Sequence, residues 1–330
     1  MPYDTELKAA IAAVRLASTV TQAVQKNLVT EDTLQKKDRS PVTVADFASQ
    51  AVICKALMDT FPNDPVVGEE DAHELREPDN TALLDSVVSH VSKAKGHGSA
   101  DEVLGWIDRG GATPPADGSM KRYWTLDPID GTKGFLRAEQ YAIALALIED
   151  GRVVLGVLGC PNLPCATTGE QGVLLVAVRG GGASAMPLNS ATVEGETIRV
   201  SDITDPARAR FCESVESGHS NQGDSAKIAQ MLGISAEPVR MDSQAKYAAV
   251  ARGDASIYLR LPTSKEYREK IWDHAAGSIV VEEAGGTVTD AFGKPLDFTH
   301  GRKLEQNRGI IATNGPIHAK VVEAVGQVIE

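Results

Sequence analysis

The sequence predicts an α+β half followed by an α/β half, with the boundary near residue 200. Apolar, strand-like runs gather between about residues 123 and 200, and short strand and helix patterns alternate after residue 205. Alternation of this kind is typical of a sheet with helices packed on it. A chain of 330 residues is long enough for one large domain or two modest ones. We expect an N-terminal domain over residues 1–200 and a C-terminal domain over residues 201–330.

Two helices are expected at the N-terminus. Residues 7–28 place apolar side chains at helical spacing, which predicts an amphipathic helix. A second helix is expected to follow the segment SPVTVAD, with Phe47 at the start of its buried face. It should end at Phe61-Pro62, because proline cannot continue a helix.

A short apolar strand, DPVV, is expected to lead from the second helix into the acidic loop GEED. Residues 72–118 are polar, weakly patterned and interrupted by glycine and proline. They predict a surface insertion with helices near 82–95 and 101–108.

From Tyr123 the pattern changes to strands. RYWTLD is the first, and two longer apolar runs join at Asp150-Gly151, a strong hairpin signal. GVLLVAVRG and TIRVS add further strands. After residue 205 we expect strand RFCESVE, helix SAKIAQMLG, strand PVRM, helix SQAKYAAVARGD and strand ASIYLRL. A helix over 273–284, capped by Gly285, precedes strands TVTD and GIIAT and a last helix from Pro316.

Composition narrows the class of protein. The net charge of −12 argues against a nucleic-acid surface, which needs clustered Lys and Arg. No segment approaches the roughly 18 apolar residues of a membrane helix, and the N-terminus lacks the pattern of a secretory signal. The four cysteines form no CxxC pair. We expect a reduced, cytoplasmic protein with buried thiols and no membrane partner.

The densest chemical signal is the segment WTLDPIDGT. A strand delivers Asp127, Pro128 prevents a helix, and a turn can bring Asp127 and Asp130 together beside the Ile129 carbonyl. Hard cations such as Mg²⁺ prefer such oxygen ligands. The alternative is that Asp130-Gly131 forms an ordinary loop turn and that Asp127 caps an element.

Three further acidic positions have alternatives of their own. Glu69 and Glu70 follow a strand, where an acidic loop is often simply solvated. Asp46 could be an acid in the first turn of a helix, and Asp273 could be an N-cap. Taken together, acids at strand ends and helix starts are what a site with two metal ions would use.

Four motifs together resemble the lithium-sensitive, magnesium-dependent phosphatase superfamily, which includes inositol monophosphatase. In chain order they are an Asp in SPVTVAD, GEE after a strand, DPIDGT and WDHAAG. The resemblance implies a layered αβαβα architecture and two or three Mg²⁺ ions, with inhibition by Li⁺ and possible sensitivity to Na⁺. It implies that metal is held by Glu69, Asp127, the Ile129 carbonyl, Asp130 and Asp273.

The same resemblance implies roles for the remaining polar positions. Asp46 and Thr132 match the pair that orients and activates the attacking water, and Glu70 matches a position near a third metal or a metal-bound water. The absence of the sequence GxxxxGK[ST] counts against a P-loop kinase or ATPase.

The second half narrows the substrate. ESGHS, DSQAKY and YLRLP resemble the bisphosphate nucleotidase branch of fungi and plants, which implies substrate contacts by Thr132, His219, Ser243, Lys246 and Arg260. The alternatives are a solvent-facing Lys246, a surface position for Arg260, an N-cap role for Ser243 and a plain turn at His219. Lysine and arginine suit the 5′-phosphate of a nucleotide bound to an otherwise acidic protein.

The resemblance therefore implies hydrolysis of adenosine 3′,5′-bisphosphate to AMP, and of 3′-phosphoadenylyl sulfate to adenylyl sulfate, in the setting of sulfate assimilation. The alternatives are an inositol phosphate phosphatase on the same scaffold and a catalytically silent nucleotide or metal sensor. The expected partner is a small nucleotide rather than nucleic acid, and nothing in the sequence marks a dimer surface, so we expect a monomer.

Overall fold

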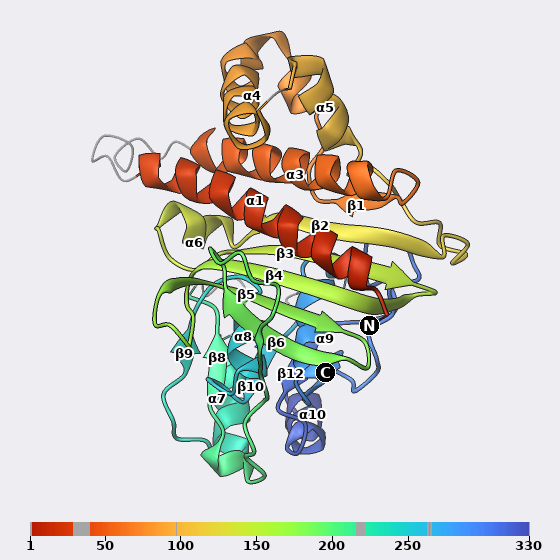
Figure 1. The fold of residues 1–330 in the computed structure, drawn as a ribbon. Helices are drawn as coiled ribbons and strands as arrows, with labels where there is room; N and C mark the ends of the chain where they lie inside the picture. Colours follow the sequence, from red (N-terminus) through yellow and green to blue (C-terminus); the bar gives the residue numbers. More distant parts are fainter. Residues whose placement is uncertain are drawn as a thin grey trace.

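The computed structural model describes residues 2–28, 40–96, 98–215, 222–262, 264 and 266–329. Its elements form five layers (Figure 1): N-terminal helices, a seven-stranded sheet, a pair of central helices, a five-stranded sheet and two outer helices. The predicted αβαβα architecture is confirmed. Among the described helices, none combines the length and apolar character needed to cross a membrane.

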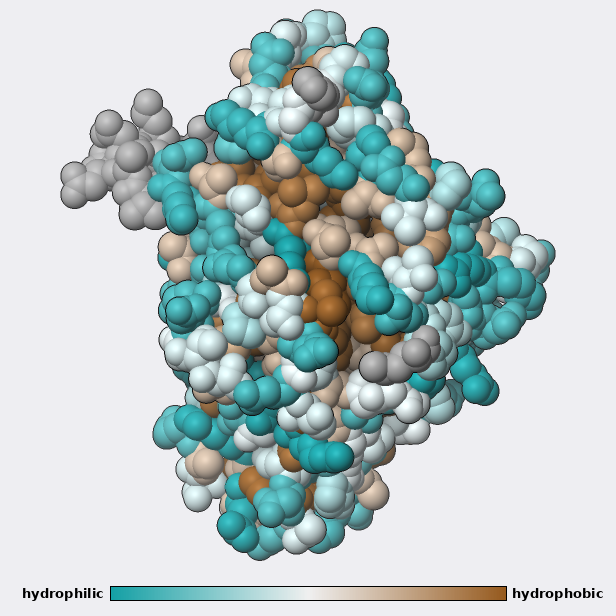
Figure 2. Space-filling model, viewed as in Figure 1, coloured by the Kyte–Doolittle hydropathy of each residue, from teal (hydrophilic) through white to brown (hydrophobic). Residues whose placement is uncertain are grey.

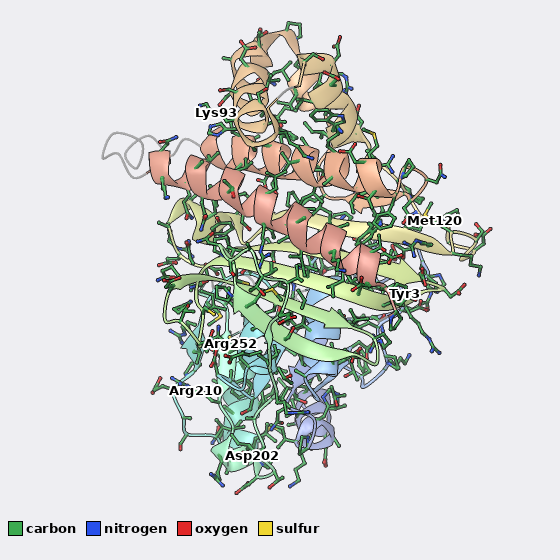
Figure 3. All side chains as sticks on the ribbon, in the orientation of Figure 1. Tyr3, Lys93, Met120, Asp202, Arg210 and Arg252 are labelled. Atoms are coloured by element: carbon green, nitrogen blue, oxygen red, sulfur yellow. The ribbon has the colours of Figure 1, made fainter. Side chains whose placement is uncertain are left out.

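The first layer consists of helices α1 (Asp4–Leu28) and α3 (Ser40–Thr60), which lie side by side over the large sheet (Figure 1). Helix α3 begins at Ser40, so the prediction that it follows SPVTVAD is wrong. Proline is favoured in the first helical turn, where its missing N–H costs nothing, and Pro41 therefore suits a helix start rather than a preceding loop. The Tyr3 hydroxyl ties the start of α1 to the sheet by donating to Glu149 at 2.6 Å (Figure 3).

Helices α4 (Thr81–Lys95) and α5 (Ala100–Asp108) pack on α3, close to the predicted bounds. Ser99 caps α5 with a capping box completed by Glu102. Residues 72–118 were predicted as a surface insertion, yet Val91 and Ile107 in this segment are fully buried in the first hydrophobic core.

The large sheet has the strand order β1-β2-β3-β4-β5-β6-β7, parallel between β1 and β2 and antiparallel elsewhere. Asp150 and Gly151 have φ of 47° and 73°, which confirms the predicted hairpin turn. TIRVS contributes only Thr197 to a strand. The bounds are β1 (Val66–Gly68), β2 (Arg122–Asp130), β3 (Ala142–Glu149), β4 (Arg152–Pro164), β5 (Gln171–Val178), β6 (Gly182–Pro187) and β7 (Glu196–Thr197).

The small sheet has the order β11-β12-β10-β8-β9, with β12 antiparallel to both of its neighbours. All the strands and helices predicted after residue 205 are present, most of them shorter than predicted. The strands are β8 (Phe211–Glu213), β9 (Val239–Arg240), β10 (Ile257–Arg260), β11 (Thr287–Thr289) and β12 (Ile310–Thr313). The helices are α7 (Gln222–Met231), α8 (Ala245–Ala251), α9 (Ala275–Glu283) and α10 (His318–Gly326).

Hydrophobic cores lie between neighbouring layers and join them. One fills the space between the N-terminal helices and the large sheet around Trp124, and another joins the two sheets through α8 and α9, with Tyr247 and Ile279 at its centre. Hydrophilic residues cover most of the face seen in Figure 2, and hydrophobic residues line the hollow along its middle. The four cysteines are buried and unpaired, as predicted. The change of sheet falls near residue 200, and a division there into two domains stays a prediction.

Candidate active site

Strand β2 delivers the two central acids. Asp127 lies opposite Ala144 and Asp130 lies opposite Ala142, so β2 has one more residue than β3 between these two paired positions, which is a β-bulge. Side chains alternate along a regular strand, and residues three apart would face opposite sides. The bulge removes this conflict, and both aspartates line the same cleft as Ile129. The alternative of Asp127 as a cap is wrong, because this residue is 2% exposed within a strand.

The acidic loop after β1 lies beside β2. The backbone N–H of Glu69 donates to the Leu126 carbonyl at 3.2 Å. Gln50 of α3 fixes the next residue by donating to the Glu70 carbonyl at 2.6 Å and accepting from the Glu70 N–H at 3.1 Å. Asp46 lies one helical turn before Gln50, and α3 therefore both carries this buried acid and holds the loop. Asp46 is the seventh residue of α3, so the alternative of a first-turn acid is wrong.

Asp273 lies in the turn before α9. The helix begins at Ala275 without a side-chain cap, so Asp273 is not its N-cap. Gln244 joins this turn to β2. Its backbone N–H donates to Asp130 Oδ2 at 2.5 Å, and its side-chain Nε2 donates to the Trp272 carbonyl at 2.8 Å. Acids from two distant parts of the chain are thereby brought to one place.

These residues border a cleft of about 410 Å³. Asp46 and Glu70 are not among its lining residues, and His219 lies outside the described residues. The predicted residues that line it are Glu69, Asp127, Ile129, Asp130, Thr132, Ser243, Lys246, Arg260 and Asp273. The sequence prediction missed Lys133, Leu136, Ser214, Asp242, Gln244 and Tyr258, which also line it.

The clustered acids perturb one another. Burial, together with the charges of Glu70 and Glu69, raises the pKa of Asp46 well above its usual range. Burial and the neighbouring acids likewise raise the pKa of Asp127. The pKa of Asp273 is raised to about 7 by burial. Burial and Glu70 raise the pKa of Glu69 to about 7, although part of this side chain faces the open cleft.

The donor set fits a divalent cation. Asp127 Oδ1 is buried and has no hydrogen-bond partner among the described residues. An unpartnered carboxylate oxygen amid other raised-pKa acids is costly without a cation. Carboxylates and a backbone carbonyl are the hard oxygen ligands of Mg²⁺.

A second acidic group near Asp273 is already compensated. Oxygen and nitrogen atoms of Glu269, Asp273 and His274 lie within 4.8 Å of one another. Arg260 Nε, however, is 2.8 Å from Glu269 Oε2, and Arg260 Nη2 is 3.7 Å from Asp273 Oδ2. His274 contacts Glu269 at 3.2 Å and the Tyr247 hydroxyl at 2.8 Å. Glu269 is therefore an anchor for Arg260 rather than a metal ligand.

Lys246 brings a buried positive charge to the cleft. It is 4% exposed, so the alternative of a solvent-facing lysine is wrong. Its Nζ lies 5.3 Å from the centre of the Tyr258 ring. Burial lowers its pKa, and the charge of Asp130 opposes that shift. Within the described part of the chain, no carboxylate lies within ion-pair distance of this ammonium.

Ser243 and Gly131 meet at the cleft wall. Ser243 has φ of 68°, a strained conformation for this residue type. Its Oγ accepts from the Ala245 N–H at 3.1 Å, but the N-cap of α8 is Gln244, so the alternative of Ser243 as the N-cap is wrong. A Cβ on Gly131 would lie 2.8 Å from the Ser243 Cβ. The Asp130-Gly131 turn and the start of α8 are therefore in direct contact.

Comparison with known proteins shows the family to which the chain belongs. Residues 3–330 match the model of the inositol monophosphatase family. The chain is 48% identical to the 3′(2′),5′-bisphosphate nucleotidase of Schizosaccharomyces pombe, over 99% of this chain and 97% of that protein. It is 45% identical to the enzyme of the same name from Emericella nidulans, over the full length of both.

Solved structures show the same fold. An inositol monophosphatase from Zymomonas mobilis covers 99% of this chain and is itself covered to 99%, with a TM-score of 0.66 and 20% identity. One from Anabaena (Nostoc) covers 100% and is covered to 98%, with a TM-score of 0.63 and 22% identity. The chain belongs to the inositol monophosphatase family and, within it, groups with the 3′(2′),5′-bisphosphate nucleotidases.

Proposed function

We propose that this protein removes the 3′-phosphate of adenosine 3′,5′-bisphosphate, giving AMP and phosphate, and converts 3′-phosphoadenylyl sulfate to adenylyl sulfate. Relatives named 3′(2′),5′-bisphosphate nucleotidase match it over essentially the whole chain. The structural observation that carries the proposal is the combination, in one cleft, of clustered acids with the buried ammonium of Lys246, which has no ion pair among the described residues. The acids suit a metal-dependent phosphatase, and the ammonium suits a second anionic group on the same substrate.

The family is one of metal-dependent phosphatases, and we assign the metal as Mg²⁺, in two or three ions. The ligands would be Glu69, Asp127, the Ile129 carbonyl, Asp130 and Asp273, with Glu70 near a third ion. When bound, Mg²⁺ lowers the pKa of water and stabilises negative charge on the transferring phosphoryl group and its leaving oxygen.

The chain's own residues orient the reactants. Asp46 on α3 and Thr132 at the start of α6 (Thr132–Leu136) act as the pair that aligns the attacking water and receives its proton. No cysteine takes part, since all four are buried and none lines the cleft. We assign the reaction as a direct, in-line attack by water, for which Asp46 and Thr132 supply the groups that orient it.

The nucleotide is held by residues of the second half. Lys246 and Arg260 bind the 5′-phosphate, and Ser243 and Thr132 contact the substrate from the cleft wall. His219 is assigned to the same group from the sequence alone. A phosphate gives Lys246 the anionic partner that a buried ammonium requires. The ion pair with Glu269 fixes the position of the Arg260 side chain.

A substrate panel tests the proposal. Phosphate release is measured with Mg²⁺ for adenosine 3′,5′-bisphosphate, 3′-phosphoadenylyl sulfate, inositol 1-phosphate and 5′-AMP, with Asp127→Asn as the control for contaminating phosphatase. We expect the two 3′-phosphorylated nucleotides to be the best substrates by kcat/KM, EDTA to abolish turnover and millimolar Li⁺ to inhibit it. A many-fold preference for inositol 1-phosphate would overturn the assignment, and Mg²⁺ binding without any turnover would indicate a sensor.

A further inference from the structure

A C-terminal segment outside the predicted motifs runs beside the metal-ligand turn. The Ile271 N–H donates to the Arg302 carbonyl at 3.2 Å, and the Leu304 N–H donates to the Glu269 carbonyl at 2.9 Å. Lys270 and Lys303 form an isolated antiparallel bridge between these bonds. The backbone of Arg302 is therefore in fixed register with the segment that carries Asp273.

The side chain of Arg302 reaches the other half of the site. Its Nη2 donates to the Gly68 carbonyl at 2.5 Å, and its Nη1 donates to the Ala112 carbonyl at 3.0 Å. Its guanidinium carbon lies 4.7 Å from the centre of the Trp272 ring. Gly68 immediately precedes Glu69, and Trp272 immediately precedes Asp273. One side chain thus contacts the residue before an acid in each half of the site.

From this geometry we propose that Arg302 is a positioning residue for the divalent cation, setting the spacing between Glu69 and Asp273. The inference rests on the proposed function, since it takes these two acids as ligands. Metal affinity depends strongly on the groups that orient the ligands, and losing such a group typically weakens binding by about 10–100-fold. Arg302 acts on the backbone next to the ligands, so the lower end of that range applies.

The planar fork of arginine is what the contacts require. Two separate N–H groups bond two carbonyls while the flat face stacks on an indole, which the single ammonium of lysine cannot reproduce. The positive charge of Arg302, taken alone, would weaken the binding of a divalent cation rather than strengthen it. Burial lowers the pKa of Arg302, while nearby Asp71 and Glu69 favour its charged form. A positive charge beside Glu69 repels Mg²⁺, so any gain from Arg302 comes from position.

Arg109 offers a matched control. Its Nη2 lies 3.0 Å from the Phe61 and Pro62 carbonyls and 2.9 Å from the Asp64 carbonyl. It braces the chain just before β1, whereas Arg302 braces the end of the same strand. Both arginines are half-buried, and both bond backbone carbonyls of neighbouring segments. Replacing Arg109 therefore loosens a comparable structure without touching a residue next to a ligand.

The test is calorimetric titration of the full chain with Mg²⁺ and no substrate, together with Tm. We expect the Mg²⁺ Kd to rise about tenfold in Arg302→Lys and in Arg302→Gln, and to stay within twofold of wild type in Arg109→Lys at a similar loss of Tm. The Mg²⁺ concentration for half-maximal activity should shift in parallel, with kcat at saturating Mg²⁺ retained.

Each other result counts against the inference. An unchanged Kd in Arg302→Lys would show that the fork does not position the ligands, and a lower Kd in Arg302→Gln would show that charge repulsion is the larger effect. Equal weakening in Arg109→Lys would reduce the role to general stability. No Mg²⁺ binding by the wild type would overturn the proposed function together with the inference, whereas the preceding results leave the proposed function standing.

Discussion

Replacing Asp127 with Asn should stabilise the metal-free protein while abolishing activity. Asp127 is buried, its Oδ1 has no partner among the described residues, and burial and the surrounding acids raise its pKa. A carboxyl whose folded-state pKa is raised holds a proton that the unfolded chain releases. The free energy of unfolding therefore falls as pH rises from about 4 to about 7, the window set by the acids around Asp127. Asparagine removes the charge but keeps the shape.

The size of the effect follows from the neighbouring acids. The pKa of Asp273 rises from 3.8 to about 7, which corresponds to about 4 kcal/mol at 1.36 kcal/mol per unit. Burial is the largest cause of this shift, and repulsion from the neighbouring acids adds to it. Removing the charge of one acid from the cluster should therefore recover only part of that free energy, about 1–2 kcal/mol. For a chain of this length that is a rise in Tm of about 2–3 °C.

The assay is thermal unfolding in EDTA at pH 7.5 and pH 5, repeated with saturating Mg²⁺. Asp127→Asn should be the more stable protein in EDTA at pH 7.5, should lose that advantage at pH 5, and should gain less from Mg²⁺ than wild type does. Asp242→Asn is the matched control, because Asp242 also lines the cleft but forms an ion pair with Arg137. It should lower Tm. A lower Tm for Asp127→Asn in EDTA at pH 7.5 would refute the reasoning.

Two further substitutions test the nucleotide side of the cleft. Lys246→Met should raise KM for adenosine 3′,5′-bisphosphate by about tenfold or more without lowering Tm, because it removes a buried charge that has no ion pair among the described residues. Steady-state kinetics measure KM and thermal unfolding measures Tm. An unchanged KM would contradict the assignment. Arg260→Ala should impair nucleotide turnover far more than inositol 1-phosphate turnover, and should cost about 2 kcal/mol by leaving Glu269 without its cation. Equal losses on both substrates would undercut the role of Arg260.

Much of this architecture could be predicted from local sequence. The hairpin at Asp150-Gly151 and the helices around 82–95 and 101–108 follow from turn chemistry and periodicity, which act over a few residues. The failures are also local in origin. TIRVS alternates like a strand but pairs only at its first residue. Ile198 still donates to the Ala183 carbonyl of β6, whereas Val200 leaves the sheet and donates to the Ala284 carbonyl.

The acids of the candidate site were predictable, and the residues that brace them were not. Asp127 and Asp130 stand in a recognisable order with other acids along the chain. Gln50 and Arg302 bond backbone carbonyls 20 and 234 residues away, at Glu70 and Gly68. Every residue has a backbone carbonyl, so the sequence does not show which carbonyl will accept the bond. Nor does a single glutamine or arginine in the sequence show that its side chain will bond to a distant carbonyl. Such residues emerge only when the fold is known.

The balance of charge in the cleft indicates that a nucleotide bisphosphate binds only when cations are bound beside the acids. Five acids among the described residues line it, namely Glu69, Asp127, Asp130, Asp242 and Asp273, against the cations Lys133, Lys246 and Arg260. Arg137 compensates Asp242 by an ion pair. Arg260 is already paired with Glu269, which reduces the positive charge it can offer. A bisphosphate adds several negative charges, which carboxylates at close range would repel by several kcal/mol in a partly buried site. The substrate therefore needs cations beside it at the 3′-phosphate, even though Lys246 can receive the 5′-phosphate. We expect nucleotide affinity to depend on Mg²⁺ more steeply for the bisphosphate than for AMP, since only the bisphosphate places a phosphate among the acids.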